Sequence, residues 1–159
     1  MIKHYRWTII PGLFILLLGC GPAYTFQENI EIPQEGWTYP DTLCFHFEIQ
    51  DTLMHYNLWL DIQHETSYPF QNIYTQFHTR YPDGSGKDQV LSIELADQSG
   101  QWNGTCRGNR CTLHIPLQNN AYFNQKGSYA ICIEQYMRES PLPGIHSIQL
   151  AIERVKPDK

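Results

Sequence analysis

An all-β fold, an antiparallel β-sandwich of jelly-roll or immunoglobulin-like form, is predicted by two features of the sequence. The first is a period of two in hydrophobicity: over short runs, large apolar residues alternate with polar ones, as in strands with one buried face. The second is the set of clusters rich in Gly, Pro, Asn, Asp and Ser that separate these runs. Many short strands joined by frequent turns favour a sandwich.

About eight strands are expected, and each is predicted by its own alternating run. In chain order the runs cover residues 28–32, 43–49, 56–62, 73–79, 91–95, 111–115, 129–133 and 148–152. The segment IEQYMRE, residues 133–139, is compatible with a strand that ends in a short helical turn. No long stretch carries an amphipathic helical pattern, so helices are not expected elsewhere.

The N-terminus has the parts of a lipoprotein signal peptide over residues 1–19. Lys3 and Arg6 precede an apolar run at 7–18, which is too short for the roughly 20 residues that a membrane-spanning helix needs. Leu17-Leu18-Gly19-Cys20 resembles a bacterial lipobox, so we expect diacylglycerol on the sulfur of Cys20. An ordinary signal peptide without lipid and a buried core helix remain as alternatives.

Three segments are therefore predicted. Residues 1–19 are the signal peptide, residues 20–36 hold the lipidated cysteine and a tether with a first short strand, and residues 37–159 form a single β-sandwich domain. About 140 residues after the signal suit one domain. The net charge of -5, without a basic cluster, excludes nucleic acid as a partner and leaves the acyl chains as the membrane attachment.

Five cysteines become an even number once Cys20 is assigned to lipid, as expected in an oxidising compartment. Cys106 and Cys111 enclose Arg-Gly-Asn-Arg, which is turn chemistry, so a disulfide closing a hairpin is predicted there. Cys44 and Cys132 lie in two strand-like runs, out of phase with the bulky residues around them. They can pair if those strands are neighbours; otherwise they are two inert thiols.

No residue pattern indicates an enzyme, a metal site or a cofactor. The GSGK at 84–87 lacks the remaining residues of a phosphate-binding loop, and the carboxylates are spread along the chain. The histidines after Cys20 are also scattered, without the spacing of a metal site. They are His46, His55, His64, His78, His114 and His146.

The tryptophans after the signal, Trp37, Trp59 and Trp102, have two interpretations. They pack in the core of the sandwich, or they form an exposed platform for sugar rings or a partner protein. Trp59 is out of phase with Leu58 and Leu60, so it faces the second side of a sheet or belongs to a surface patch.

A series of short motifs in a fixed order resembles the GldH gliding-motility lipoproteins of Bacteroidetes over nearly the whole chain. The motifs are Tyr68, Pro69 and Asn72; Pro82-Asp83-Gly84; Leu95-Ala96-Asp97 followed by Gly100, Trp102 and Gly104; Gly127 and Tyr129; Met137-Arg138; and Leu142, Gly144 and Ile145. Cys106 and Cys111 depart from the glycine-rich turn expected at that place, which suggests a disulfide particular to a subset of the family.

The resemblance implies an envelope lipoprotein that is not an enzyme. It implies a non-catalytic accessory or scaffold of the gliding-motility and type IX secretion machinery, with other gliding lipoproteins, GldJ in particular, and secretion components as partners. Candidate surface residues are Trp59, Tyr68, Asn72, Tyr74, Trp102, Met137 and Arg138. The alternative function is an envelope glycan-binding module that uses Trp59, Trp102 or Tyr74 as a stacking surface.

Two further expectations concern location and modification. Gly21 follows the lipidated cysteine and no acidic cluster precedes Glu28, which favours the periplasmic face of the outer membrane over surface display. The two Asp-Thr-Leu sequences are similar to O-glycosylation sites of Bacteroidetes, so Thr42 and Thr52 are candidate sites.

Overall fold

The computed structural model describes residues 24–155, and its regular secondary structure there consists of nine strands and no helix. The strands are β1 Tyr24–Glu31, β2 Leu43–Ile49, β3 His55–Glu65, β4 Asn72–Arg80, β5 Gly86–Glu94, β6 Thr105–Arg107, β7 Arg110–Tyr122, β8 Gly127–Gln135 and β9 Ile145–Val155. The predicted all-β class is confirmed. The extra strand is β6, which has 3 residues and pairs with the start of β7; a hairpin was expected at this place, but its first arm was not counted as a strand.

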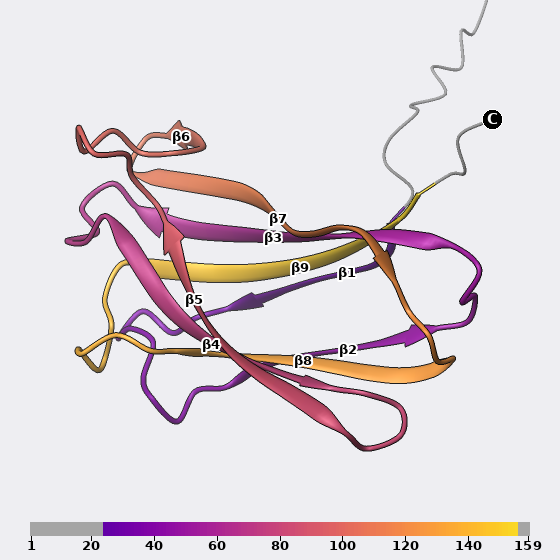
Figure 1. Ribbon diagram of the computed structural model, residues 1–159. Coiled ribbons are helices and arrows are strands. Elements are labelled where there is room, and N and C mark those ends of the chain that lie inside the picture. Colours follow the sequence, from indigo (N-terminus) through magenta and orange to yellow (C-terminus); the bar gives the residue numbers. More distant parts are fainter. Residues whose placement is uncertain (1–23, 156–159) are drawn as a thin grey trace, which may run out of the picture.

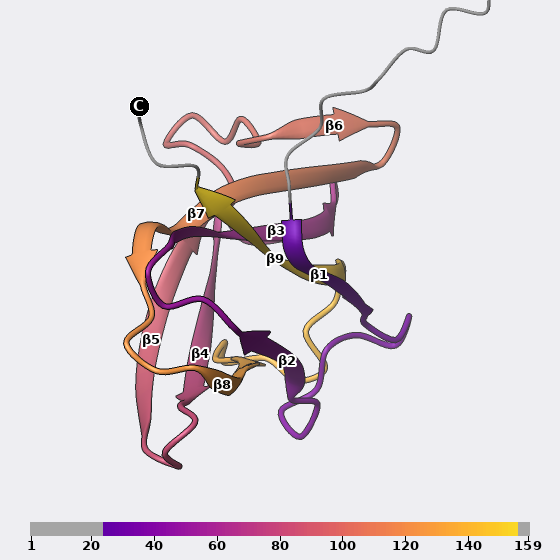
Figure 2. The same ribbon diagram turned by 90° about the vertical axis from the view of Figure 1, so that its right-hand side faces the viewer.

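The strands form two antiparallel sheets that pack face to face (Figure 1). One has the order β1-β9-β3-β7-β6 and the other β2-β8-β4-β5. In Figure 2, β3, β7 and β9 lie in the upper part of the view and β2 and β8 below them, while β4 and β5 run up its left side. The predicted antiparallel β-sandwich is therefore confirmed.

The core lies between the sheets and is built from the residues that the period of two places on one face. In β2, Leu43, Phe45, Phe47 and Ile49 are buried while the residues between them are half-buried or exposed. Since Ile148, Leu150 and Ile152 of β9 face the same interior from the other sheet, each sheet covers the apolar face of the other.

The sandwich begins earlier in the chain than expected. β1 pairs with β9 from Tyr24↔Glu153 to Glu31↔Ser147 and so forms the edge of the five-stranded sheet. The expected boundary at residue 37 is wrong, because those paired residues and the buried Ile32 belong to the folded domain. The predicted signal peptide, the lipid on Cys20 and the start of the tether lie outside the described residues.

The helical turn expected within 133–139 is also wrong. The strand part is present as β8, but after Gln135 the chain bends without forming a helix. The buried Gln135 side chain determines this bend: its Oε1 accepts the Met137 N–H at 2.8 Å, and its Nε2 donates to the Glu139 carbonyl at 3.0 Å. Tyr136 N–H donates to the Tyr74 carbonyl at 2.8 Å, so the chain continues alongside β4.

The two ends of the sandwich carry different loops and chain ends. We call the end where β1 begins and β9 ends the N-terminal pole; it also carries the β2–β3 loop, 50–54, and the β7–β8 loop, 123–126 (Figure 1). The opposite end, which we call the distal pole, carries the β3–β4 loop, 66–71, and the β8–β9 connection, 136–144. Among residues 24–155 there is no helix long and apolar enough to span a membrane.

Candidate functional site

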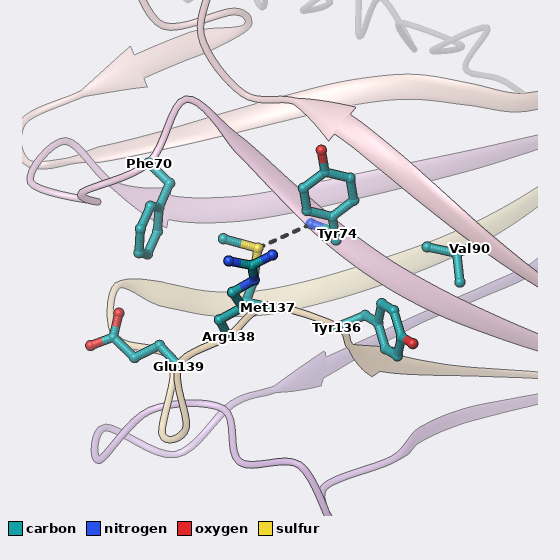
Figure 3. Close-up of a pocket in the computed structure, with 7 residues that line it drawn as sticks. All are labelled: Phe70, Tyr74, Val90, Tyr136, Met137, Arg138 and Glu139. Atoms are coloured by element: carbon teal, nitrogen blue, oxygen red, sulfur yellow. Dashed lines mark hydrogen bonds between the residues drawn. The ribbon is translucent and has the colours of Figure 1, made fainter.

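An open hollow of about 670 Å³ lies on the outer face of the four-stranded sheet, toward the distal pole (Figure 3). We call it the outer-face hollow. Most of its lining is apolar, from aromatic rings, an isopropyl group and a thioether, and a guanidinium and a carboxylate complete it. The lining residues are Phe70, Tyr74, Val90, Tyr136, Met137, Arg138 and Glu139.

Hydrogen bonds hold the lining in place. The Tyr74 N–H donates to Met137 Sδ at 3.2 Å, as drawn in Figure 3. The Tyr39 hydroxyl donates to the Met137 carbonyl at 3.1 Å. Together with the bonds from Gln135 and Tyr136 described above, these contacts tie the segment after β8 to β4. The hollow is therefore preformed, which lowers the entropy lost when a partner binds.

The exposed large hydrophobic side chains of residues 24–155 gather at two places. Tyr74 at 44%, Val90 at 47% and Tyr136 at 58% exposed line the hollow, and Tyr39 at 49% lies beside it. The other two, Leu53 and Tyr122, are at the N-terminal pole. A contiguous exposed apolar patch is typical of an interaction site, whereas single exposed apolar residues need no explanation.

Three of the residues predicted for an interaction surface, Tyr74, Met137 and Arg138, line the hollow together. Asn72 lies two residues before Tyr74 on β4, half-buried, with its amide donating to Ser92 Oγ at 3.0 Å. The sequence reasoning missed Phe70, Val90, Tyr136 and Glu139. Val90 had a usable signal, because it is out of phase with the inward-facing Leu91 and Ile93 of β5.

Tyr68 was predicted to lie on the surface, and this is wrong. Its side chain is only 4% exposed and belongs to the core, with the hydroxyl donating to the Asn72 carbonyl at 3.3 Å. Burial raises the pKa of the phenol above its ordinary value, and the nearby Glu139 carboxylate adds to the effect. Trp102 is half-buried against the core, with its ring centroid 4.6 Å from that of His64.

The aromatic residues considered for a glycan platform do not share a surface. Trp59 lies on the outer face of the five-stranded sheet and Tyr74 on the outer face of the other sheet. The Trp59 ring stacks on His114, with centroids 4.7 Å apart and an interplanar angle of 14°, and its Nε1 donates to Glu153 at 3.1 Å. One ring face and the N–H of Trp59 are thus already in use, and any stacking surface would have to be formed by one of these aromatic residues without the other.

Two disulfides join the cysteines of the described residues. Cys44 and Cys132 lie directly opposite each other on β2 and β8 and are bonded across the outer face of the four-stranded sheet. Cys106 and Cys111 are bonded across the β6–β7 hairpin, which turns at Gly108.

The two candidate glycosylation sites are in different surroundings. Thr42, just before β2, is exposed and its hydroxyl donates to Glu134 at 2.9 Å. Thr52, in the β2–β3 loop, is half-buried. For metal binding, residues 24–155 contain no group of three or more His, Cys, Asp or Glu side chains arranged to hold an ion.

His64 makes the stability of the sandwich dependent on pH. Its side chain is fully buried, Nδ1 donates to the Glu65 carbonyl at 2.9 Å, and Nε2 has no partner. Desolvation therefore lowers the pKa of His64 below 6.5, an effect opposed by the Glu65 bond and increased by His146. Below about pH 6.5 the unfolded chain binds the proton more readily than the folded one, so stability falls as the pH drops.

We expect the urea midpoint to be lower at about pH 5.5 than at about pH 7.5. His64→Leu, which cannot bind a proton, should show a smaller difference between the two pH values. An equal difference in the variant and the parent would contradict this role of His64.

The fold and the hollow define an all-β sandwich protein with an exposed apolar hollow on the outer face of one sheet. The chain belongs to the GldH lipoprotein family, whose sequence model matches residues 24–152, and this confirms the resemblance found in the motifs. The family is one of lipoproteins and is not a known enzyme family.

Named relatives agree with this assignment. The chain is 26% identical over 140 residues to the gliding motility lipoprotein GldH of Flavobacterium johnsoniae, covering 85% of this chain and 84% of that protein. It is 22% identical over 147 residues to a GldH homolog of Christiangramia forsetii, covering 88% and 90%. A solved family GH115 4-O-methyl-alpha-glucuronidase matches with a TM-score of 0.45 and 14% identity, over 86% of this chain and 18% of that one, which is too weak to support an argument.

Proposed function

We propose that this protein is a lipid-anchored, non-catalytic accessory of the gliding-motility and type IX secretion machinery, and that the outer-face hollow binds an envelope protein of that machinery. Membership of the GldH family supports the role in motility. The hollow is the observation that carries the binding role, because three of the six exposed large apolar side chains of residues 24–155 line it and a fourth, Tyr39, lies beside it.

The anchor is proposed to be diacylglycerol on Cys20, on the periplasmic face of the outer membrane. Support comes from the lipobox-like Leu17-Leu18-Gly19-Cys20 and from a family described as lipoproteins. In this arrangement the lipid retains the protein on the membrane, and the sandwich supplies the contact with the machinery.

The occupant we propose for the hollow is an aromatic or aliphatic side chain of a partner protein, with a polar flank. The apolar rings of Tyr74 and Tyr136 would cover the apolar group. Arg138, beside Met137, and Glu139, at the edge of the lining (Figure 3), would pair with polar or charged groups of the partner. A buried aromatic contact surrounded by a polar rim is typical of the residues that dominate binding energy at interfaces.

Affinity purification from detergent-solubilised envelopes tests this function. The parent protein should recover GldJ or another named motility or secretion component. Tyr74→Ser should lower that recovery about tenfold, because losing one central aromatic contact costs about 1.4 kcal/mol or more.

The matched control is Trp59→Ser, which removes a half-buried aromatic side chain from the outer face of the other sheet; its recovery should equal that of the parent. Equal recovery with Tyr74→Ser would overturn the assignment of the hollow. Recovery of no motility or secretion component by the parent would overturn the proposed function.

A further inference from the structure

The N-terminal pole presents two large apolar side chains to solvent. Leu53, in the β2–β3 loop, is 88% exposed, and Tyr122, at the end of β7, is 62% exposed. No other large hydrophobic side chain of residues 24–155 is as exposed as these two. Leaving a leucine this exposed gives up the free energy that its burial would contribute, about 1.5–3 kcal/mol.

The structure holds Leu53 in this exposed position. Its N–H donates to Asp51 Oδ1 at 3.0 Å, and the other oxygen of that carboxylate accepts from Arg154 Nη2 at 3.0 Å. The Tyr56 hydroxyl donates to the Asp51 carbonyl at 2.7 Å. The loop is thus tied to both β3 and β9, so the side chain of Leu53 projects from a braced support.

Tyr122 lies next to this loop in the sheet. It pairs with His55, the first residue of β3, and the two rings meet edge to face with centroids 6.2 Å apart. Leu53 precedes His55 by two residues, so both apolar side chains belong to the same corner of the sandwich.

The chain between the proposed anchor and the sandwich is short. β1 begins at Tyr24, which pairs with Glu153, and Glu153 pairs with Asn57, two residues from His55. The backbone path from Cys20 to Tyr24 is four residues, and at full extension it spans at most about 14 Å. Because the acyl chains of a lipidated Cys20 lie in the bilayer, this pole must stay within about 14 Å of the membrane surface.

We propose that the N-terminal pole is a membrane-contact surface, in which Leu53 and Tyr122 enter the boundary between headgroups and acyl chains of the leaflet that holds the anchor. The inference rests on the proposed lipid at Cys20. A leucine supplies apolar area to that boundary, and tyrosine, apolar in its ring and polar at its hydroxyl, suits it. Lipid anchoring is strengthened by a second contact of this kind.

Charge at this pole is compatible with a membrane of mostly uncharged headgroups. Asp51 and Arg154 neutralise each other in their ion pair at 3.0 Å. Across the pole, the Asp83 carboxylate accepts from Gln125 at 3.0 Å, Lys126 supplies positive charge, and Arg80 pairs with Asp88 at 3.3 Å. The contact would therefore depend on apolar insertion and not on attraction to anionic lipids.

This contact would also orient the protein. With the N-terminal pole on the lipid, the distal pole (Figure 1) points away from the membrane, and the hollow beside it (Figure 3) is open to a partner. An anchor without a second contact would not by itself fix the orientation of the sandwich.

Fluorescence quenching by brominated lipid tests the proposal with the full-length lipidated protein. The protein is reconstituted in phosphatidylethanolamine vesicles doped with dibromo-phosphatidylcholine, which quenches only indoles inserted into the bilayer. We expect Leu53→Trp to lose most of the fluorescence that the new indole adds. The matched control is Val90→Trp, at an exposed site in the hollow, which should lose none.

Failure to quench Leu53→Trp, or equal quenching of Leu53→Trp and Val90→Trp, would overturn the membrane-contact surface while leaving the anchor and the partner role in place. The anchor has its own readout: Cys20→Ser should take up no palmitate label and should not be retained on the vesicles. Retention of Cys20→Ser with full labelling would overturn the lipid assignment, and with it the basis of this inference.

Discussion

Replacing both Cys44 and Cys132 with alanine is expected to lower the free energy of unfolding by about 4–5 kcal/mol. The two residues are 88 positions apart, so their disulfide closes a long loop and removes much of the conformational entropy of the unfolded chain. Such a loss is a large part of the stability of an ordinary domain. Urea unfolding of the oxidised parent and the double variant measures it.

The second disulfide provides the matched control. Cys106 and Cys111 are 5 positions apart, and the same entropic relation assigns a loop of that length only about 2 kcal/mol. The double variant Cys106→Ala with Cys111→Ala should therefore retain more stability than the Cys44 and Cys132 variant. Equal losses for the two pairs would show that loop closure is not the source of the stabilisation.

Trp37→Ala is expected to cost about 3–5 kcal/mol of folding free energy, because it leaves a large cavity in the core. The indole is 0% exposed, and its Nε1 donates to the Asp41 carbonyl at 2.7 Å. The backbone of Trp37 also exchanges two hydrogen bonds of 2.9 Å with Leu142. The residue thereby joins the β1–β2 connection to the β8–β9 connection that borders the hollow.

Trp59→Ala is the control for this prediction. Trp59 is half-buried on the outer face of a sheet, where solvent can fill the space left by the ring. Its removal loses the stacking on His114 and the bond to Glu153 but creates no core cavity, so the cost should be about 1–2 kcal/mol. Urea unfolding curves of both variants measure the two losses of folding free energy. Equal losses for Trp59→Ala and Trp37→Ala would contradict the assignment of Trp37 to the core and Trp59 to the surface.

The positions of most strands could be predicted because their signal is local. In 43–49 each apolar residue that the pattern assigns to a buried face is buried, and the residues between them are half-buried or exposed. Any strand with one buried face shows this alternation of apolar and polar residues in its sequence, because successive side chains point to opposite faces. The first strand was predicted too short and outside the domain. None of its residues is fully buried, and half-buried and exposed residues do not alternate regularly along it, so its local signal is weak.

The site could be predicted only in part. Tyr74, Met137 and Arg138 were among the expected surface residues, but nothing in the sequence indicated that they meet Phe70 and Val90 in one hollow. The bend after β8 depends on hydrogen bonds from the side chain of Gln135. A bend made by such a bond between side chain and backbone leaves no periodic pattern to detect.

What the sequence by itself determined is the all-β class, the alternation of each long strand and the family, because these depend on neighbouring residues and on the order of short motifs. The tertiary structure alone decided that Trp37 and Tyr68 are core residues while Tyr74 and Tyr136 line a hollow. It alone also placed that hollow away from the pole where β1 begins. The physical reason is that burial depends on which sheet face meets the other sheet, and this is settled by contacts between residues far apart in the chain.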